Sequence, residues 1–175
     1  MSEELVVLLD DAGNPIGTTP KATVHTEDTP LHRAFSCFVH NEQGQILLTR
    51  RALSKKTWPG VWTNSFCGHP GPDEPDTEAI ARRAQDELGM RITDITEVLP
   101  DFRYRAIDAS GIVENEICPV HVAVVDEQPS ANPDEVAEWE WVDVDDLLAA
   151  VIRTPFAFSP WLAEQLPLLR RHGEV

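Results

Sequence analysis

The chain of 175 residues lacks the features that would place it in or across a membrane. It has no apolar run approaching the roughly 20 residues that cross a bilayer, and its first residues lack the basic stretch of a signal peptide. Its three cysteines cannot all pair with one another, and the C-x-x-C spacing of dithiol redox proteins is missing. We therefore expect a cytoplasmic protein with free thiols and no membrane partner.

Positive charge is scarce in this chain. The 14 lysines and arginines face 30 acidic residues, which leaves a net charge of −16. Such a surface repels nucleic acid, so we expect no nucleic-acid partner. Nine of the basic residues nevertheless fall between Arg50 and Arg105. This cluster of basic residues in an acidic chain favours a small, highly charged anion as ligand. Each basic residue taken alone is equally well explained as a solvated surface charge.

Internal repeats, low-complexity tracts and long linkers are also missing, so we expect a single domain over residues 1–175. Several strands come first, one helix follows in the middle and further helices end the chain. This order predicts an α+β fold, or mixed α/β sandwich. No heptad repeat or marked apolar patch indicates the oligomeric state, and a monomer is compatible with the sequence.

Local patterns predict the individual elements. Residues 34–39 and 45–49 should form a hairpin across the turn at 41–44, and the segment 21–31, which contains Pro30, should be a loop. Further strands are expected at 5–9, 117–125 and 139–142. Helices are expected from a cap at 76–78 to Leu88 with Gly89 as the stop, from Asp143 to about Val151, and from Ser159 onward.

The most informative stretch is Cys67-Gly68-His69, where a lone thiol stands beside an imidazole at a glycine-containing break. Nearby basic residues should lower the pKa of this thiol and make it a better proton acceptor. Cys37 and Cys118 lie in strand patterns instead and are expected to be small core residues. Cys67 is therefore the candidate reactive cysteine.

Histidines and glutamates suggest a metal site. His25 and His32 lie seven residues apart in the predicted loop, and His69 follows the candidate cysteine. Glu114 and Glu116 are spaced i, i+2, so both carboxylates point to one face if the segment is extended. Three imidazoles and two carboxylates would suit an octahedral ion such as Mn²⁺ or Mg²⁺ better than a four-coordinate structural zinc. Taken alone, His25 and His32 are each better explained as a packed or surface residue than as a metal ligand.

From Gly68 onward the spacing resembles the Nudix box, G-x5-E-x7-R-E-U-x-E-E-x-G-U, in which helical glutamates hold divalent metal against a diphosphate. Arg83 stands where the box has a glutamate, and Asp86 replaces another. The lost negative charge should reduce the number of metals held and leave Glu87 for one Mg²⁺. A thiol ahead of a box altered in this way suggests an enzyme that binds a diphosphate without hydrolysing it. The matching positions are held by Glu74, Arg82, Glu87 and Gly89.

Further motifs are spread over residues 21–161. They are Lys21, His25-x6-His32, Arg50-Arg51-x3-Lys55, the run Trp58 to Pro70, Tyr104-Arg105-Ala106, Glu114-Asn115-Glu116 and Phe158-Ser159-Pro160-Trp161. Together they closely resemble the type I isopentenyl-diphosphate Δ-isomerase family. This resemblance implies a Nudix-like fold, with a central mixed sheet flanked by helices, and an isomerase that interconverts isopentenyl and dimethylallyl diphosphate as its small-molecule substrates.

Carried over residue by residue, the resemblance also implies roles. Cys67 and Glu116 would be the proton-transfer pair on opposite sides of the bound olefin, with Tyr104 hydrogen-bonded near the glutamate. Trp161 would offer its ring face to a carbocation. A Mn²⁺, Zn²⁺ or Mg²⁺ ion would be held by His25, His32, His69, Glu114 and Glu116. The diphosphate would be contacted by Lys21, Arg51, Lys55 and Arg83, and its bridging Mg²⁺ by Glu87.

Two alternatives stay open at this point. The first is a Nudix pyrophosphohydrolase of a nucleoside diphosphate derivative, against which Arg83 in a metal-holding slot argues. The second is a non-catalytic metal-binding module, which would be indifferent to replacement of Cys67. Glu135, before a predicted strand, is interpreted as a surface residue, although Nudix proteins sometimes use acidic residues in this region. Core or turn packing is expected of Trp58, Trp62, Trp139 and Trp141.

Overall fold

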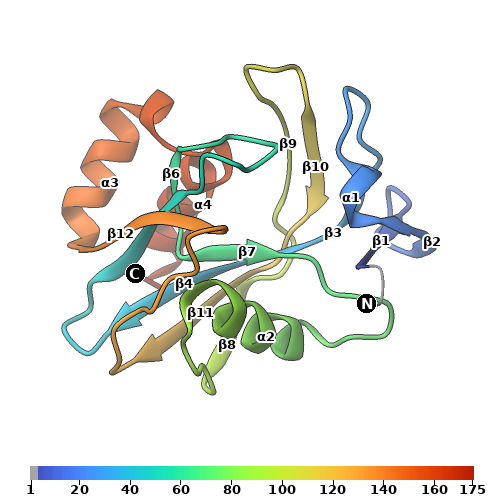
Figure 1. Cartoon of the computed structure of the whole chain (residues 1–175). Helices are drawn as coiled ribbons and strands as arrows, with labels where there is room; N and C mark the ends of the chain where they lie inside the picture. The colour runs from blue at the N-terminus through green and yellow to red at the C-terminus, as the bar shows by residue number, and fades with distance from the viewer. Residues whose placement is uncertain (1–3) are drawn as a thin grey trace.

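The computed structural model describes residues 4–175, which form twelve strands, four α-helices and one 3-10 helix (Figure 1). Residues 1–3, part of the stretch used to argue against a signal peptide, lie outside the described residues. No helix within 4–175 is long and apolar enough to cross a membrane.

The helices are α1 (Lys21–Val24), α2 (Asp76–Leu88), α3 (Val144–Arg153), the 3-10 helix η1 (Pro155–Ala157) and α4 (Pro160–His172). The strands are β1 (Leu5–Leu9), β2 (Pro15–Pro20), β3 (His32–Arg33), β4 (Phe35–Asn41), β5 (Ile46–Arg51), β6 (Trp62–Thr63), β7 (Phe66–Gly68), β8 (Ile95–Leu99), β9 (Arg103–Ile107), β10 (Val113–Ile117), β11 (Val120–Val125) and β12 (Val136–Val142).

Two mixed sheets form the centre of the molecule. The larger has the order β12-β5-β4-β11-β8, with β6 paired to β5 and β7 paired to β4. The smaller has the order β2-β1-β3-β10-β9. Each sheet contains one parallel pair among antiparallel ones, β4 with β11 in the larger and β3 with β10 in the smaller.

Strand β4 shows how the larger sheet buries both of its faces. Successive side chains of a strand point to opposite faces. Phe35 and Cys37 pack with Ile80 of α2, whereas Phe38 packs with Leu166 of α4 on the other side. In Figure 1, α2 (green) and the pair α3 and α4 (orange to red) lie on opposite sides of this sheet. The predicted mixed α/β sandwich, with a mixed sheet flanked by helices, is confirmed.

The predicted single strand over 117–125 is wrong. β10 ends at Ile117 and β11 begins at Val120, with Pro119 between them. Proline has no N–H to donate to a sheet, so the pairing stops there. The two halves then join different sheets, and the chain crosses from the smaller to the larger sheet at this point.

The helix over 76–88 is confirmed, but its predicted cap is wrong. Pro75 is the N-cap and makes no side-chain cap hydrogen bond, while Asp76 pairs with Arg33. Gly89 ends the helix with a φ of 62°, which glycine adopts without strain.

The other predicted elements agree with the structure, with small changes. The helices at 143 and 159 begin as expected, because Asp143 and Ser159 each accept an N-cap hydrogen bond. The predicted loop at 21–31 starts with the single turn of α1. The hairpin at 34–49 is present, and its strands β4 and β5 are paired at His40 and Ile46.

Candidate active site

A pocket of about 430 Å³ collects residues from nearly the whole chain. Its wall includes Cys67 of the larger sheet and Glu116 of the smaller sheet. Of the residues to which the motifs assign a role, His32 is fully buried behind the wall and the rest line the pocket. The residues concerned are Lys21, His25, Arg51, Lys55, Cys67, His69, Arg83, Glu87, Tyr104, Glu114, Glu116 and Trp161.

The register of the smaller sheet positions the predicted catalytic glutamate. Glu116 on β10 is paired with His32 of β3 on one side and with Tyr104 of β9 on the other. Glu114 lies two residues earlier on the same strand and lines the same pocket, as the i, i+2 spacing predicts. Both carboxylates are buried.

The predicted metal ligands converge on one point. One atom each of His25, His32, His69 and Glu116 lies within 4.8 Å of all the others. His69 Nε2 is 3.2 Å from His32 Nε2 and 3.0 Å from Glu116 Oε1. Glu114 joins the group through Oε2, which is 2.9 Å from His25 Nε2. Neighbouring ligands about 2.1 Å from an ion lie about 3 Å from one another, so this spacing fits a divalent metal.

The hydrogen bonds around this cluster also fit an ion. A carbonyl only accepts, so His32 donates its Nδ1–H to the carbonyl of Pro30 (2.9 Å), which orients the ring with Nε2 toward the cluster. His25 Nε2 and Glu114 Oε2 are buried and have no hydrogen-bond partner among residues 4–175. Buried polar atoms without partners are unfavourable, and an ion between these two would satisfy both.

The same contacts set the charge of Glu116. Burial raises the pKa of its carboxyl, but the hydrogen bonds and charges of His32 and His69 hold that pKa well below its usual value. Tyr104 donates its hydroxyl to Glu116 Oε2 at 3.0 Å, and burial together with the glutamate's charge raises the pKa of this tyrosine well above its ordinary value. Glu116 is therefore an ionised carboxylate with one oxygen toward the histidines and one toward Tyr104.

Cys67 lies on β7 opposite Ser36 of β4. Burial raises the pKa of the Cys67 thiol to about 12, against weaker opposing effects from hydrogen bonds with Ser36 and Asn64 and from the charge of Arg51. The prediction that nearby cations lower this pKa is wrong, because burial of the sulfur outweighs the arginine. Cys67 therefore carries its proton in the pocket. Cys37 and Cys118 are buried core residues, as predicted.

A buried amide links the thiol to Trp161. Asn64 is fully buried, and its Oδ1 accepts hydrogen bonds from Cys67 Sγ (3.3 Å) and Trp161 Nε1 (3.0 Å), and a third from Thr63 Oγ1 (3.0 Å). Its Nδ2 donates to two backbone carbonyls. Sequence reasoning gave Asn64 no role, since its indole partner lies 97 positions away in the chain.

Trp161 forms an aromatic wall with its neighbours. The ring of Trp58 lies 5.3 Å from it and that of Tyr104 5.7 Å, both centre to centre. The guanidinium of Arg51 lies 5.5 Å from the Trp161 ring centre and donates to the backbone carbonyl of Thr57. Arg51 thus reaches the pocket as predicted. The positive charge of Arg51 lies beside the Trp161 ring, which was expected to face a carbocation.

Helix α2 reaches the pocket because Gly68 has no side chain. A Cβ at this position would lie 2.8 Å from Phe35 and 2.9 Å from Arg83, closer than such contacts occur. Arg82 makes two hydrogen bonds of 2.9 Å to Glu74, which holds the loop after β7 against the helix. These matched Nudix-box residues therefore position the helix, while Arg83 faces the pocket and is not an exposed helical residue.

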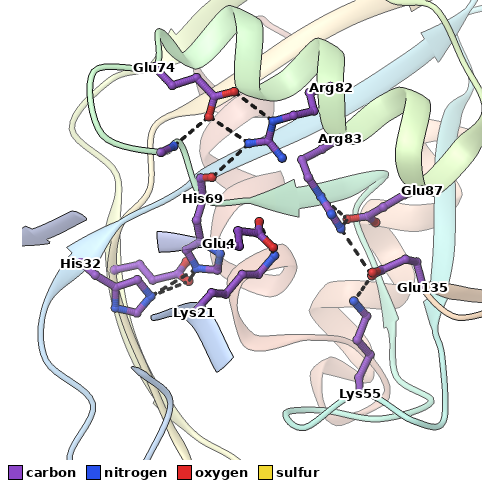
Figure 2. A network of polar contacts seen from close by, with 12 residues as sticks. Glu4, Lys21, His32, Lys55, His69, Glu74, Arg82, Arg83, Glu87 and Glu135 are labelled. Carbon is purple, nitrogen blue, oxygen red and sulfur yellow. Dashed lines mark hydrogen bonds and ion pairs between the residues drawn. The ribbon is translucent and has the colours of Figure 1, made fainter. Parts of the chain in front are cut away.

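The mouth of the pocket carries three of the predicted diphosphate contacts, and each basic side chain is paired with a carboxylate of the same pocket (Figure 2). Glu135 was expected at the surface, and this prediction is wrong, because its side chain lines the pocket and is only 24% exposed. Its partners lie far away in sequence. The pairs are Lys21 with Glu4 (2.9 Å), Lys55 with Glu135, and Arg83 with Glu87 and with Glu135 (3.4 Å).

Comparison with known proteins decides the family. The NUDIX domain matches residues 30–166. The chain is 64% identical over 166 residues to the isopentenyl-diphosphate Δ-isomerase of Clavibacter michiganensis, which covers 95% of this chain and 86% of the relative. It is 62% identical over 175 residues to the protein of the same name from Corynebacterium glutamicum, with 96% and 93% covered. The chain belongs to the isopentenyl-diphosphate Δ-isomerase family of Nudix proteins.

Solved structures show that this isopentenyl-diphosphate Δ-isomerase family member has the Nudix fold. A Deinococcus radiodurans protein matches with a TM-score of 0.73 and 23% identity, covering 94% of this chain and 98% of that one. A MutT protein from Methanosarcina mazei matches with a TM-score of 0.65 and 21% identity, covering 83% and 97%. These distant likenesses concern the fold alone.

Proposed function

We propose that this protein is an enzyme that interconverts isopentenyl and dimethylallyl diphosphate by moving a carbon–carbon double bond. The observation that carries the proposal is one pocket with a protonated Cys67 from the larger sheet and an ionised Glu116 from the smaller sheet. Relatives that share 62–64% of their residues with nearly the whole chain bear the name of this isomerase.

The chemistry of the substrate calls for such a pair. Its double bond is unactivated, so addition of a proton creates a tertiary carbocation. One group has to deliver that proton, and another has to remove a different proton from the neighbouring carbon. Cys67 and Glu116 together hold one proton to deliver and one site to receive another. The reverse reaction uses the same pair in the opposite sense.

A divalent ion belongs to this proposal. The cluster of His25, His32, His69, Glu114 and Glu116 has the mixed nitrogen and oxygen donors of a Mn²⁺, Zn²⁺ or Mg²⁺ site. When bound there, the ion tunes the protonation of Glu116 and holds its orientation. Glu87, at the mouth, would hold a Mg²⁺ that would offset the negative charge of the diphosphate.

The remaining residues bind and shield the substrate. Lys21, Arg51, Lys55 and Arg83 would contact the diphosphate, which directs the hydrocarbon toward the deep end of the pocket. Trp161 and Tyr104 line that end with rings that cannot attack a carbocation. Exclusion of water prevents capture of the cation as an alcohol.

The alternative of a Nudix pyrophosphohydrolase is disfavoured by Arg83. Where the box has a metal-holding glutamate, this arginine faces the pocket and pairs with Glu87. A positive side chain at that place opposes the binding of several metal ions on the helix.

Incubation with isopentenyl diphosphate in D₂O, followed by NMR of the products and metal analysis of the same sample, tests the proposal. We expect dimethylallyl diphosphate to appear and deuterium to enter the hydrocarbon. Cys67→Ala, prepared and loaded with metal in the same way, should show neither. A folded, metal-loaded preparation that leaves deuterium out, or that releases phosphate from a panel of nucleoside diphosphate derivatives without isomerisation, contradicts it.

A further inference from the structure

Glu135 is placed rigidly at the mouth of the pocket. It directly precedes β12, its backbone N–H donates to the carbonyl of Asn132, and its own carbonyl accepts from the N–H of Ala52. The side chain extends from this anchored backbone into the pocket, where it meets Lys55 and Arg83 (Figure 2). One carboxylate therefore bridges two cations that come from separate parts of the chain.

The contacts of Glu135 with Lys55 and Arg83 affect how strongly any anion binds at the mouth. A diphosphate that binds Lys55 and Arg83 competes with Glu135 for these two cations. The freed carboxylate then stands beside the negatively charged ligand, and so does Glu87, which also loses its arginine. Like charges in a partly buried site repel one another strongly, because water screens them little. Bare diphosphate is therefore opposed by the two carboxylates that hold its binding groups in the free protein.

A divalent cation on the diphosphate changes this balance. Carboxylate oxygens are preferred protein ligands of Mg²⁺, and Glu87 and Glu135 become available together once the arginine and the lysine turn to phosphate oxygens. The Lys21–Glu4 pair differs, because its side chains are 27% and 45% exposed and solvent screens their charges more effectively.

We infer that Glu135 makes the pocket selective for diphosphate that carries a divalent cation. In the free protein Glu135 is the counter-ion of Lys55 and Arg83, and in the complex it faces the cation on the diphosphate beside Glu87. The inference rests on the proposed function, because it takes a diphosphate as the ligand of the mouth. It adds a residue that selects the form of the ligand and takes no part in the proton transfer.

Calorimetric titration with inorganic diphosphate tests this, using protein loaded beforehand with Zn²⁺ and freed of excess ion. Without Mg²⁺ we expect Glu135→Gln to bind diphosphate about tenfold more tightly than the unaltered protein, because one opposing charge has gone. With Mg²⁺ the variant should gain much less affinity than the unaltered protein gains. Equal or weaker binding of metal-free diphosphate by Glu135→Gln overturns the inference.

Glu138→Gln is the matched control. Glu138 lies on β12, three residues after Glu135, and also pairs with an arginine, Arg50, but both side chains are outside the pocket. Its diphosphate affinity should equal that of the unaltered protein under both conditions. Glu135→Asp keeps the charge and should keep the dependence on Mg²⁺, so loss of that dependence in this variant also overturns the inference. If the unaltered protein binds no diphosphate with or without Mg²⁺, the proposed function fails instead.

Discussion

The deep end and the mouth of the pocket hold their charges in different ways. At the deep end, Glu116 is surrounded by His32, His69 and Tyr104, and its side chain is only 5% exposed. At the mouth, each cation is paired directly with a glutamate, and the exposure of the glutamate side chains ranges from 10% for Glu87 through 24% for Glu135 to 45% for Glu4. Those carboxylates would have to release their cations to an anionic ligand.

Burial explains what this difference means for function. A buried polar atom that loses its hydrogen-bond partner cannot bond to water instead, so the groups around it shift. A change at the deep end therefore disturbs the alignment of the reacting groups. A cation paired with a carboxylate at the mouth keeps a charged partner when it exchanges that carboxylate for the oxygens of an anionic ligand. Changes at the deep end should therefore act on kcat, and changes at the mouth on the affinity for diphosphate.

The largest effect should come from the proton-transfer pair. Cys67→Ala and Glu116→Gln should each lower kcat by about 1,000-fold or more, since a positioned acid or base contributes that much. NMR of the isomerisation measures the rate, and circular dichroism checks the fold. Cys37→Ala, at a buried cysteine outside the pocket, should keep its turnover. Near-normal isomerisation by Cys67→Ala or Glu116→Gln would show that these deep-end residues do not control kcat.

Loss of a metal ligand should have the next largest effect. His32→Gln should lower metal affinity by about 100-fold, at the upper end of the loss seen when even an outer partner of a ligand is removed. Chelation should lower the melting temperature of the unaltered protein by about 10 °C and that of the variant by much less.

The control for this prediction is His121→Gln. His121 lies in a second group with Asp76 and Glu97, where Arg33 already pairs with Asp76. We expect it to keep the bound ion. Metal analysis that finds the ion lost from His121→Gln and kept in His32→Gln would move the metal site away from the pocket.

A charge reversal at the mouth should act on affinity. Arg83→Glu should raise KM about 30-fold, because a charged hydrogen bond to diphosphate is replaced by repulsion. Its kcat should change far less. Steady-state kinetics separate the two, and Arg91→Glu, an exposed basic residue just beyond α2, should leave both unchanged. An unchanged KM in Arg83→Glu would remove this residue from the diphosphate site.

The smallest effect on activity should come from Asn64. Asn64→Ala leaves the buried Cys67, Trp161 and Thr63 donors without their acceptor, so we expect kcat to fall about tenfold with KM unchanged, and stability to fall by about 3 kcal/mol. Kinetics and thermal melts measure both. Asn41→Ala, at the end of β4 and outside the pocket, is the control and should keep its kcat. If Asn64→Ala had a raised KM and a normal kcat, Asn64 would act on diphosphate binding as the mouth residues do. The expected difference between the deep end and the mouth would then not hold.

Short-range patterns predicted much of the site. The run Cys67-Gly68-His69 and the i, i+2 pair Glu114 and Glu116 carry their chemistry within a few residues, and the structure gathers them in one pocket. Glu135 and Asn64 escaped prediction. The contact between Lys55 and Glu135 spans 80 positions, and the sequence around Glu135 has the polar character of a surface turn.

The fold shows the same limit. Apolar runs bounded by turn residues predicted strands as long as β1 and β4, but β3, β6 and β7 have only two or three residues, too few for such a run to appear. These short strands matter for the site, because β3 carries His32 and β7 carries Cys67. Pairing with neighbouring strands, which no local pattern reports, makes them strands.

The sequence by itself determined the order of the long elements, which follows from residue types at short, regular spacing, and the family resemblance, which in turn implied the candidate reacting groups. Only the tertiary structure decided that Cys67 keeps its proton and that Glu135 bridges Lys55 and Arg83. The physical reason is that burial and ion pairing depend on which distant segments the two sheets bring together, and a pKa responds to that surrounding rather than to sequence neighbours.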